Sequence, residues 1–286
     1  MILNLLKVVF FSALLFVLGF FFSFQKEGPS NDIKNGTEKE TVVTWNESAP
    51  VLEAKAACVF DAAKNEFIFE LNSDAQLPLA SLTKIMTAIT AREYLLQTAL
   101  VEISEEILAQ EGDSGFCPGE NWSLADLTDA MLVSSSNDAA FAIAGAAGKD
   151  FVKMMNKKAK DIGLTQTYFL NSTGLDFSEQ IAGAYGSCRD MVNLAKYALV
   201  RHPQLLEVTT KESYSYGDII FENTNKLLAK LPVLFGGKTG FSDLAGGNLI
   251  VVVDKGLGHP MILVVLGSTF DGRFDDTEVL YDKFVK

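Results

Sequence analysis

The sequence predicts a mixed α/β (α+β) domain, in which strands from both ends of the chain form one antiparallel sheet and helices lie between them. Short apolar, β-branched or aromatic segments occur early, at residues 56–61 and 66–71, and late, at residues 247–253 and 261–266. Helical periodicity dominates the sequence between them. Apolar residues make up 48% of the 286 positions, which is enough for a core between two packed layers.

The sequence of the first part of this domain predicts a β-hairpin followed by a helix. Four residues, 62–65, separate the two early strand-like runs, as is typical of a β-hairpin. Pro78 is suited to the first turn of a helix, so we expect a helix to begin there. Apolar residues then follow at the i, i+3, i+4, i+7 spacing of one helix face: Leu82, Ile85, Met86 and Ile89.

The middle of the sequence predicts four further helices. Capping boxes, in which a serine precedes an acidic residue by three positions, mark two helix starts at Ser123 and Ser187. Gly163 marks one helix end. The predicted helices are residues 121–133, 138–148, 151–162 and 191–200. The predicted elements that follow are strands at 213–221, 247–253 and 261–266 and an acidic helix at 273–284.

Residues 8–24 form an uninterrupted apolar run, which predicts a signal-anchor segment within residues 1–24. As a helix this run would be about 25 Å long, close to the hydrocarbon thickness of a bilayer. Lys7 precedes it, which predicts a cytoplasmic N-terminus and a folded domain on the outside of the cell membrane. A cleaved signal peptide is the alternative, although the run lacks the small residues of a cleavage site. Residues 25–50 are polar and predict a linker to a domain at 51–286.

The composition is acidic and poor in residues that bind metals. A formal net charge of −12 argues against nucleic acid as a partner, because nucleic-acid binding needs a basic face. The three cysteines, Cys58, Cys117 and Cys188, have no metal-like spacing, and at most one disulfide can form among them. We expect Cys58 in the core and Cys117 at the surface. With only two histidines in the chain, we expect no metal and no cofactor.

Ser81 and Lys84 form the first of three motifs that can carry chemistry, Ser-Leu-Thr-Lys. A serine hydroxyl is a poor nucleophile until a base takes its proton. Three positions apart on a helix, the two side chains lie on one face within reach of each other. The helix N-terminus and burial should lower the pKa of Lys84, so that it can act as this base. A surface helix with an ordinary lysine is the alternative for this motif taken alone.

Ser135, Ser136 and Asn137 form the second motif, at a break between two predicted helices. Side chains at such a break can point into a cleft. Ser135 could then pass a proton to a leaving amine, and Asn137 could hold a substrate carbonyl or Lys84. A helix N-cap is the alternative, because serine and asparagine both suit that position.

Lys238, Thr239 and Gly240 form the third motif, followed by Phe241. Glycines beside a strand indicate a backbone that another group approaches closely, although a plain glycine-rich turn is the alternative. Lys238 and Thr239 would bind a terminal carboxylate. The amides of Phe241 and Ser81 could together form an oxyanion hole.

The three motifs, in this order, indicate a serine acyl-transfer site with a cation for an anionic substrate end. With them, the chain resembles the serine D-Ala-D-Ala carboxypeptidases, which are low-molecular-weight penicillin-binding proteins of the β-lactamase/transpeptidase-like superfamily. The resemblance covers residues 51–286. Its matching segments are residues 78–88, 132–133, 135–139, 169–171, 174–176 and 237–246.

In that family the serine is acylated by the D-Ala-D-Ala end of peptidoglycan stem peptides, D-Ala leaves, and water releases the shortened peptide. β-Lactams acylate the same serine as covalent inhibitors. The resemblance implies that Ser81 is the nucleophile, Lys84 the base and Lys238 the carboxylate anchor, with Ser135 and Asn137 as the second catalytic element. It implies no cofactor.

Two departures from the family pattern are visible. The family usually has glycine where this chain has Ser136, and a side chain there could narrow the cleft and alter substrate choice. Many members also carry a C-terminal β-rich domain and an amphipathic anchor helix. This chain stops near the end of the catalytic domain, and its predicted anchor is N-terminal.

Three alternatives to a carboxypeptidase share these motifs. A class A β-lactamase also needs a glutamate, typically in E-x-x-L-N, and the region after Asn137 has Glu179 without that pattern. A related D,D-endopeptidase that cuts cross-links shares all these motifs and stays open as an alternative. A catalytically silent, membrane-tethered wall-binding protein is the alternative from a different class, and the intact Ser81, Lys84 and Lys238 argue against it.

Overall fold

The computed structural model of the protein describes residues 49–112 and 115–286. Residues Leu52–Lys286 form one compact unit. The predicted signal-anchor run at 8–24 lies outside the described residues, as does the linker up to residue 48. Within the two described ranges, no helix is both long enough and apolar enough to cross a membrane.

A five-stranded antiparallel sheet forms the centre of this unit, in the order β10-β11-β12-β1-β2. Strands from the two ends of the domain meet where β1 pairs with β12, with Ala56 opposite Leu266. This confirms the predicted sheet built from both chain ends. The strands are β1 (Ala56–Asp61), β2 (Glu66–Leu71), β10 (Leu234–Ser242), β11 (Gly246–Asp254) and β12 (Pro260–Ser268).

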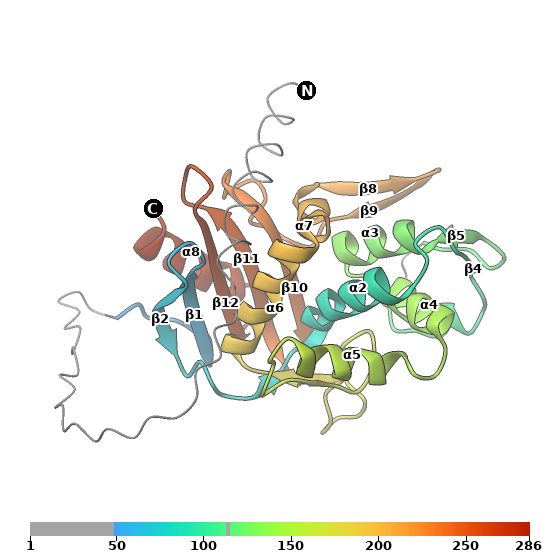
Figure 1. Cartoon of the computed structure of the whole chain (residues 1–286), viewed down its shortest axis with the longest axis horizontal. Coiled ribbons are helices and arrows are strands. Elements are labelled where there is room, and N and C mark those ends of the chain that lie inside the picture. Colours follow the sequence, from blue (N-terminus) through green and yellow to red (C-terminus); the bar gives the residue numbers. More distant parts are fainter. Residues whose placement is uncertain (1–48, 113–114) are drawn as a thin grey trace, which may run out of the picture. The chain divides into compact units, whose positions relative to one another are not determined.

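Both faces of the sheet are covered by helices (Figure 1). Alternate residues of β11, such as Leu249 and Val251, pack with Phe274 and Leu280 of α8 (Gly272–Phe284) in one apolar cluster. α6 (Cys188–Arg201) packs against the sheet through β1, β11 and β12. Strands buried on both faces read as continuous apolar runs, which is why β11 and β12 could be predicted from the sequence.

The helix that carries the first motif, α2 (Thr83–Tyr94), is the centre of a helical group beside the sheet. Its residues from Thr83 to Ala91 are all buried, because helices pack around it. The surrounding helices are α3 (Leu124–Ser134), α4 (Asn137–Ala147), α5 (Phe151–Asp161), α6 and the short α7 (Pro203–Glu207). The predicted caps are confirmed, since Ser123 Oγ accepts from the amide of Asp126 and Ser187 Oγ from that of Asp190.

Short elements complete the fold. Among the described residues, the 3₁₀ turns are η2 (Ala80–Leu82), η3 (Ile107–Ala109) and η4 (Val208–Thr210). Three small antiparallel sheets pair the remaining strands, in the orders β3-β7-β6, β4-β5 and β8-β9. These strands are β3 (Leu77–Pro78), β4 (Leu100–Glu102), β5 (Asn121–Ser123), β6 (Tyr168–Phe169), β7 (Ala184–Gly186), β8 (Ser213–Tyr216) and β9 (Ile219–Glu222).

Three predicted element boundaries were wrong. Pro78 does not open a helix, because it pairs in β3 with β7, and α2 begins only at Thr83. Residues 121–123 belong to β5, so the helix there starts one position after Ser123. The segment 213–221 is a hairpin rather than one strand, since Gly217, with a φ of +58°, turns the chain between β8 and β9.

Candidate active site

Ser81 lies in the 3₁₀ turn η2, directly before α2, and a close backbone contact holds this turn. The preceding Ala80 has a φ of +47°, a left-handed conformation that costs a non-glycine residue on the order of 1 kcal/mol. Gly174 presses against it: a Cβ atom at Gly174 would lie 1.9 Å from Ala80 O. With its own φ of +82°, Gly174 is the residue type that this approach requires.

Lys84 is fully buried, and its Nζ has three hydrogen-bond partners. These are Ser81 Oγ at 2.9 Å, Asn137 Oδ1 at 2.7 Å and the backbone oxygen of Thr173 at 2.7 Å. Burial, and secondly the positive charge of Lys238, hold the pKa of Lys84 well below its ordinary value. A neutral amine has two hydrogens, which the two carbonyl oxygens can accept. Its lone pair then points to the Ser81 hydroxyl, as a general base requires.

The second motif is divided between two roles. Asn137 contacts Lys84 through Oδ1 and donates through Nδ2 to Glu111 O at 2.8 Å, which fixes the orientation of the amide. Ser136 caps a helix, and its predicted effect on the width of the cleft stays a prediction. It is buried and is the N-cap of α4, with its Oγ accepting the amide of Ala139 at 3.1 Å. The N-cap alternative is therefore right for Ser136, and Asn137 is the residue that reaches Lys84.

Ser135 is the left-handed C-cap of α3, with a φ of +65°. This conformation turns the chain between α3 and α4 and places Ser135 half-buried, two residues before Asn137. Among the described residues, no hydrogen bond joins Ser135 to Ser81 or Lys84. Its predicted part in proton transfer therefore stays a prediction.

Lys238 and Thr239 lie on β10, which is an edge strand of the sheet and contacts the η2 turn. Lys238 is 2% exposed, and its Nζ donates to Thr239 O at 3.0 Å. Burial, and secondly the charge of Arg273, lower its pKa to about 7. Arg273, on α8, donates from Nη1 to Gly240 O at 2.7 Å. Burial lowers the pKa of Arg273 to about 10.

The sequence reasoning did not identify Arg273. The residue was visible only as the first position of the predicted C-terminal helix, where an arginine is unremarkable. Its guanidinium lies 4.5 Å from the ring centroid of Phe270 and 6.0 Å from that of Phe241, so aromatic rings cover much of it.

Strand β10 packs against the turn that carries Ser81. Gly240 packs on η2 so tightly that a Cβ there would be 3.3 Å from Ser81 N. Gly237 donates its amide to Thr209 Oγ1, away from β11. Backbone groups two residues apart in a strand point to the same side, so the amides of Thr239 and Phe241 face the free edge as well. The oxyanion hole predicted from the amides of Ser81 and Phe241 stays a prediction, with which the edge-facing amide of Phe241 agrees.

Lys84, Lys238 and Arg273 form a row of buried basic side chains in a chain of net charge −12, and Lys238 and Arg273 are the two that carry the positive charge. In the described part of the chain, neither lysine forms an ion pair with a carboxylate. Each has another basic side chain near it instead: Lys238 acts on Lys84, and Arg273 acts on Lys238. Buried charge without a partner is costly, and an anionic ligand would offset that cost. The arrangement can therefore activate a serine, stabilise an oxyanion and hold an anionic group beside it.

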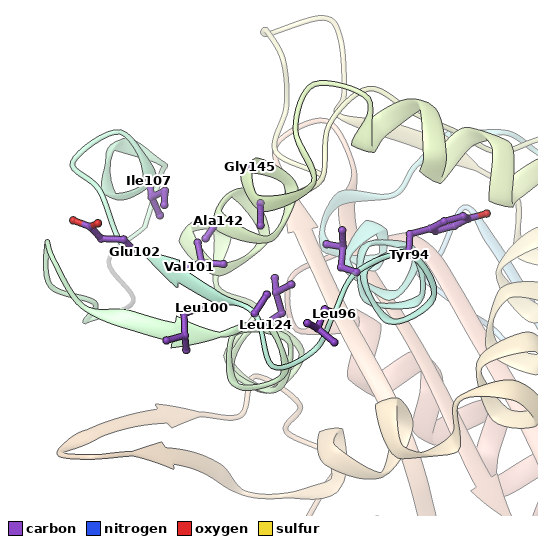
Figure 2. A pocket seen from close by; sticks show the side chains of 12 residues that line it. Tyr94, Leu96, Leu100, Val101, Glu102, Ile107, Leu124, Ala142 and Gly145 are labelled. Atoms are coloured by element: carbon purple, nitrogen blue, oxygen red, sulfur yellow. The ribbon is translucent and has the colours of Figure 1, made fainter.

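A surface hollow lies away from the motif residues. This hollow of about 570 Å³ lies between the end of α2, β4 and α4 (Figure 2), and the motif residues do not line it. Leu96 and Leu100 are exposed at its rim.

Across residues 49–112 and 115–286, no three His, Cys, Asp or Glu side chains gather closely enough to hold a metal ion. Cys58 is buried and Cys117 is exposed, as predicted.

Comparison with known proteins places the chain in a family. The family model described as D-alanyl-D-alanine carboxypeptidase matches residues 43–269. The carboxypeptidase DacC of Escherichia coli strain K12 is 32% identical over 81% of this chain and 61% of its own length. DacF of Bacillus subtilis strain 168 is 34% identical over 76% of this chain and 58% of its own length. The chain thus spans about three fifths of the length of these curated relatives.

A solved structure gives the same result. Penicillin-binding protein D2 from Listeria monocytogenes, in its cefotaxime-bound form, is 32% identical and has a TM-score of 0.75, with 82% of this chain and 98% of that chain covered. The mixed α/β architecture is therefore that of the penicillin-binding proteins. The chain belongs to the D-alanyl-D-alanine carboxypeptidase family, peptidase S11.

Proposed function

We propose that the chain is a serine D,D-carboxypeptidase, which removes the terminal D-Ala from peptidoglycan stem peptides through an acyl-enzyme on Ser81. The observation that carries this proposal is the environment of Lys84. Two carbonyl oxygens, of Asn137 and Thr173, accept from its Nζ, and Ser81 Oγ is the third partner at 2.9 Å. This geometry supports a neutral amine that takes the serine proton.

The proposed reaction has two halves. Ser81 Oγ attacks the carbonyl carbon of the penultimate D-Ala while its proton moves to Lys84 Nζ. The oxyanion accepts hydrogen bonds from the amides of Ser81 and Phe241. The C–N bond then breaks as the proton held by Lys84 passes to the leaving nitrogen, so the terminal D-Ala leaves as an amine and Lys84 is neutral again. In the second half, water attacks the ester carbon and gives a proton to Lys84. The bond from the carbonyl carbon to Ser81 Oγ then breaks, Lys84 returns the proton to Oγ, and the shortened peptide leaves with a new carboxyl group that ionises.

The buried basic side chains of Lys238 and Arg273 support a substrate whose end is a carboxylate. A peptide ending in D-Ala-D-Ala has a carboxylate one residue beyond the scissile bond. Lys238 and Thr239 stand two positions and one position before Gly240, which contacts Ser81, so they can bind that carboxylate. Arg273 adds a second positive charge near Gly240 O. The relatives DacC and DacF, both named D-alanyl-D-alanine carboxypeptidases, support the same assignment.

Two further parts of the proposal rest on the relatives and on the sequence. β-Lactams acylate Ser81 in this proposal, which the cefotaxime-bound relative supports. The domain works outside the cytoplasm, held at the membrane by the apolar run at 8–24. Rapid hydrolysis of β-lactams is not expected, because Glu179 is not part of an E-x-x-L-N pattern and is exposed in a turn.

The test is mass spectrometry of peptidoglycan fragments after incubation with the purified chain. Pentapeptide stems should lose one alanine, and the Ser81→Ala variant should leave them unchanged. Loss of cross-linked dimers without loss of alanine from monomers would replace this proposal with the endopeptidase alternative. No change to either fragment would contradict both activities.

A further inference from the structure

The hydroxyl of Thr239, which stands in the proposed carboxylate site, is hydrogen-bonded to a second hydroxyl. Thr239 is 4% exposed on β10, and its Oγ1 lies 2.6 Å from Oγ1 of Thr224. Either oxygen can be the donor in this bond. Only one hydrogen lies between the two oxygens, so the hydrogen of the accepting hydroxyl points elsewhere.

The turn that carries Thr224 is held firmly against β10. Asn223 donates from Nδ2 to Thr209 O at 2.9 Å, and Asn225 N donates to Asn223 Oδ1 at 2.8 Å. Thr209 in turn accepts the amide of Gly237, in β10, through its Oγ1 at 2.9 Å. The two threonine hydroxyls are thus fixed relative to each other by the surrounding backbone, and Thr224 is not free to turn away.

The chemistry of the ligand decides which hydroxyl donates. A carboxylate only accepts hydrogen bonds, so Thr239 can bind it only by donating its own hydrogen. Thr224 must then donate to Thr239 Oγ1. A hydrogen bond to a charged acceptor is roughly twice as strong as one between neutral groups, and each bond in such a chain polarises the next. The chain from Thr224 through Thr239 therefore favours an anionic group over a neutral one.

We infer that Thr224 is a positioning residue: it donates to Thr239, sets the direction of the Thr239 hydroxyl and so sharpens the preference for a substrate that ends in a carboxylate. This role rests on the proposed function, in which Lys238 and Thr239 bind that carboxylate. Thr224 lies two residues after the end of β9, and its amide makes a long hydrogen bond of 3.4 Å to Val133 O near the end of α3. It thus stands between the second motif and the third.

The experiment compares acylation of the full chain by benzylpenicillin and by its methyl ester, which lacks the anionic group. Thr224→Val removes the hydroxyl and keeps the shape, whereas Thr224→Ser keeps the hydroxyl. Thr210→Val is the matched control, because the Thr210 hydroxyl donates to Glu207 O, whereas that of Thr224 is bonded to Thr239. Acylation rates are measured by intact mass, and thermal unfolding of each variant is followed in parallel.

In Thr224→Val we expect the second-order acylation rate to fall on the order of 10-fold for the acid and less than about 2-fold for the ester. Thr224→Ser and Thr210→Val should both keep the wild-type ratio of acid to ester. An equal fall for acid and ester, no fall for the acid, or no rescue by serine would overturn the role of Thr224. A wild-type chain that benzylpenicillin does not acylate would overturn the proposed function, and this role with it.

Discussion

Gly174 gives the sharpest prediction about how the fold positions the nucleophile. In Gly174→Ala the new Cβ would lie 1.9 Å from Ala80 O, where real Cβ atoms essentially never come closer than 3.0 Å to a neighbour. Relieving this contact requires a displacement of about 1 Å in the turn that precedes Ser81. The new side chain also meets Thr83 Oγ1 at 2.8 Å, so the turn cannot move freely in that direction.

The magnitude follows from two costs. A left-handed alanine costs about 1 kcal/mol, and overpacking a well-packed site costs about 1–3 kcal/mol more, so the free energy of unfolding should fall by about 2–4 kcal/mol. A displacement of about 1 Å at a catalytic group can lower a rate about 100-fold. We therefore expect acylation of Ser81 to slow about 100-fold while the domain still folds.

The assay is the second-order rate of labelling by a fluorescent penicillin, together with urea unfolding. Gly163→Ala is the matched control: Gly163 has a φ of +77° but nothing within 4 Å of its Cβ position, so it carries only the conformational cost. This control should lose about 1 kcal/mol and label at the wild-type rate. Labelling of Gly174→Ala within about 3-fold of the wild type would refute the claim that this contact sets the position of Ser81.

Three further predictions concern charge and capping. The pH profile of kcat/KM should rise as Lys84 loses its proton and fall above about pH 7 as Lys238 loses its charge, and a rate that keeps rising past pH 9 would contradict this assignment. Burial raises the pKa of Glu93, but hydrogen bonds, first among them that from His202, outweigh it and lower the pKa to about 2. Glu93→Gln should therefore lower the free energy of unfolding by roughly 2–4 kcal/mol at pH 7. The difference from the wild type should shrink as pH falls from about 4.5 toward 2, and a difference that is independent of pH would argue against this role of the Glu93 charge. Ser136→Gly should cost only a few tenths of a kcal/mol and leave penicillin labelling within about 2-fold, and a changed ratio of rates between two β-lactams would show that Ser136 shapes the cleft after all.

Local sequence signals predicted the helices and the main sheet well. Ser123 and Ser187 cap helices in the structure as they do in the sequence pattern, since a capping serine acts within three residues of itself. Pro78 was misassigned because its strand pairs with residues more than 100 positions later, at Tyr185. No local signal contains such a pairing, and a proline suits a strand edge as well as a helix start.

The candidate site was predictable where side chains of a distinctive chemistry form the motifs. Ser81, Lys84 and Asn137 meet in the structure as their motifs suggested. The third partner of Lys84 is the backbone oxygen of Thr173. No sequence pattern predicts this contact, because every residue has a backbone carbonyl. Arg273 was missed for a related reason: α8 brings it to Gly240 only through the packing of a helix on the sheet.

The location of the acyl group tests the central claim most directly. The full chain is exposed briefly to benzylpenicillin, digested, and mapped by mass spectrometry. We predict one adduct, on the peptide that contains Ser81, which is absent from Ser81→Ala and slow to form in Lys84→Ala. An adduct on another residue, or one that persists in Ser81→Ala, would contradict the account of Ser81 as the nucleophile and Lys84 as its base.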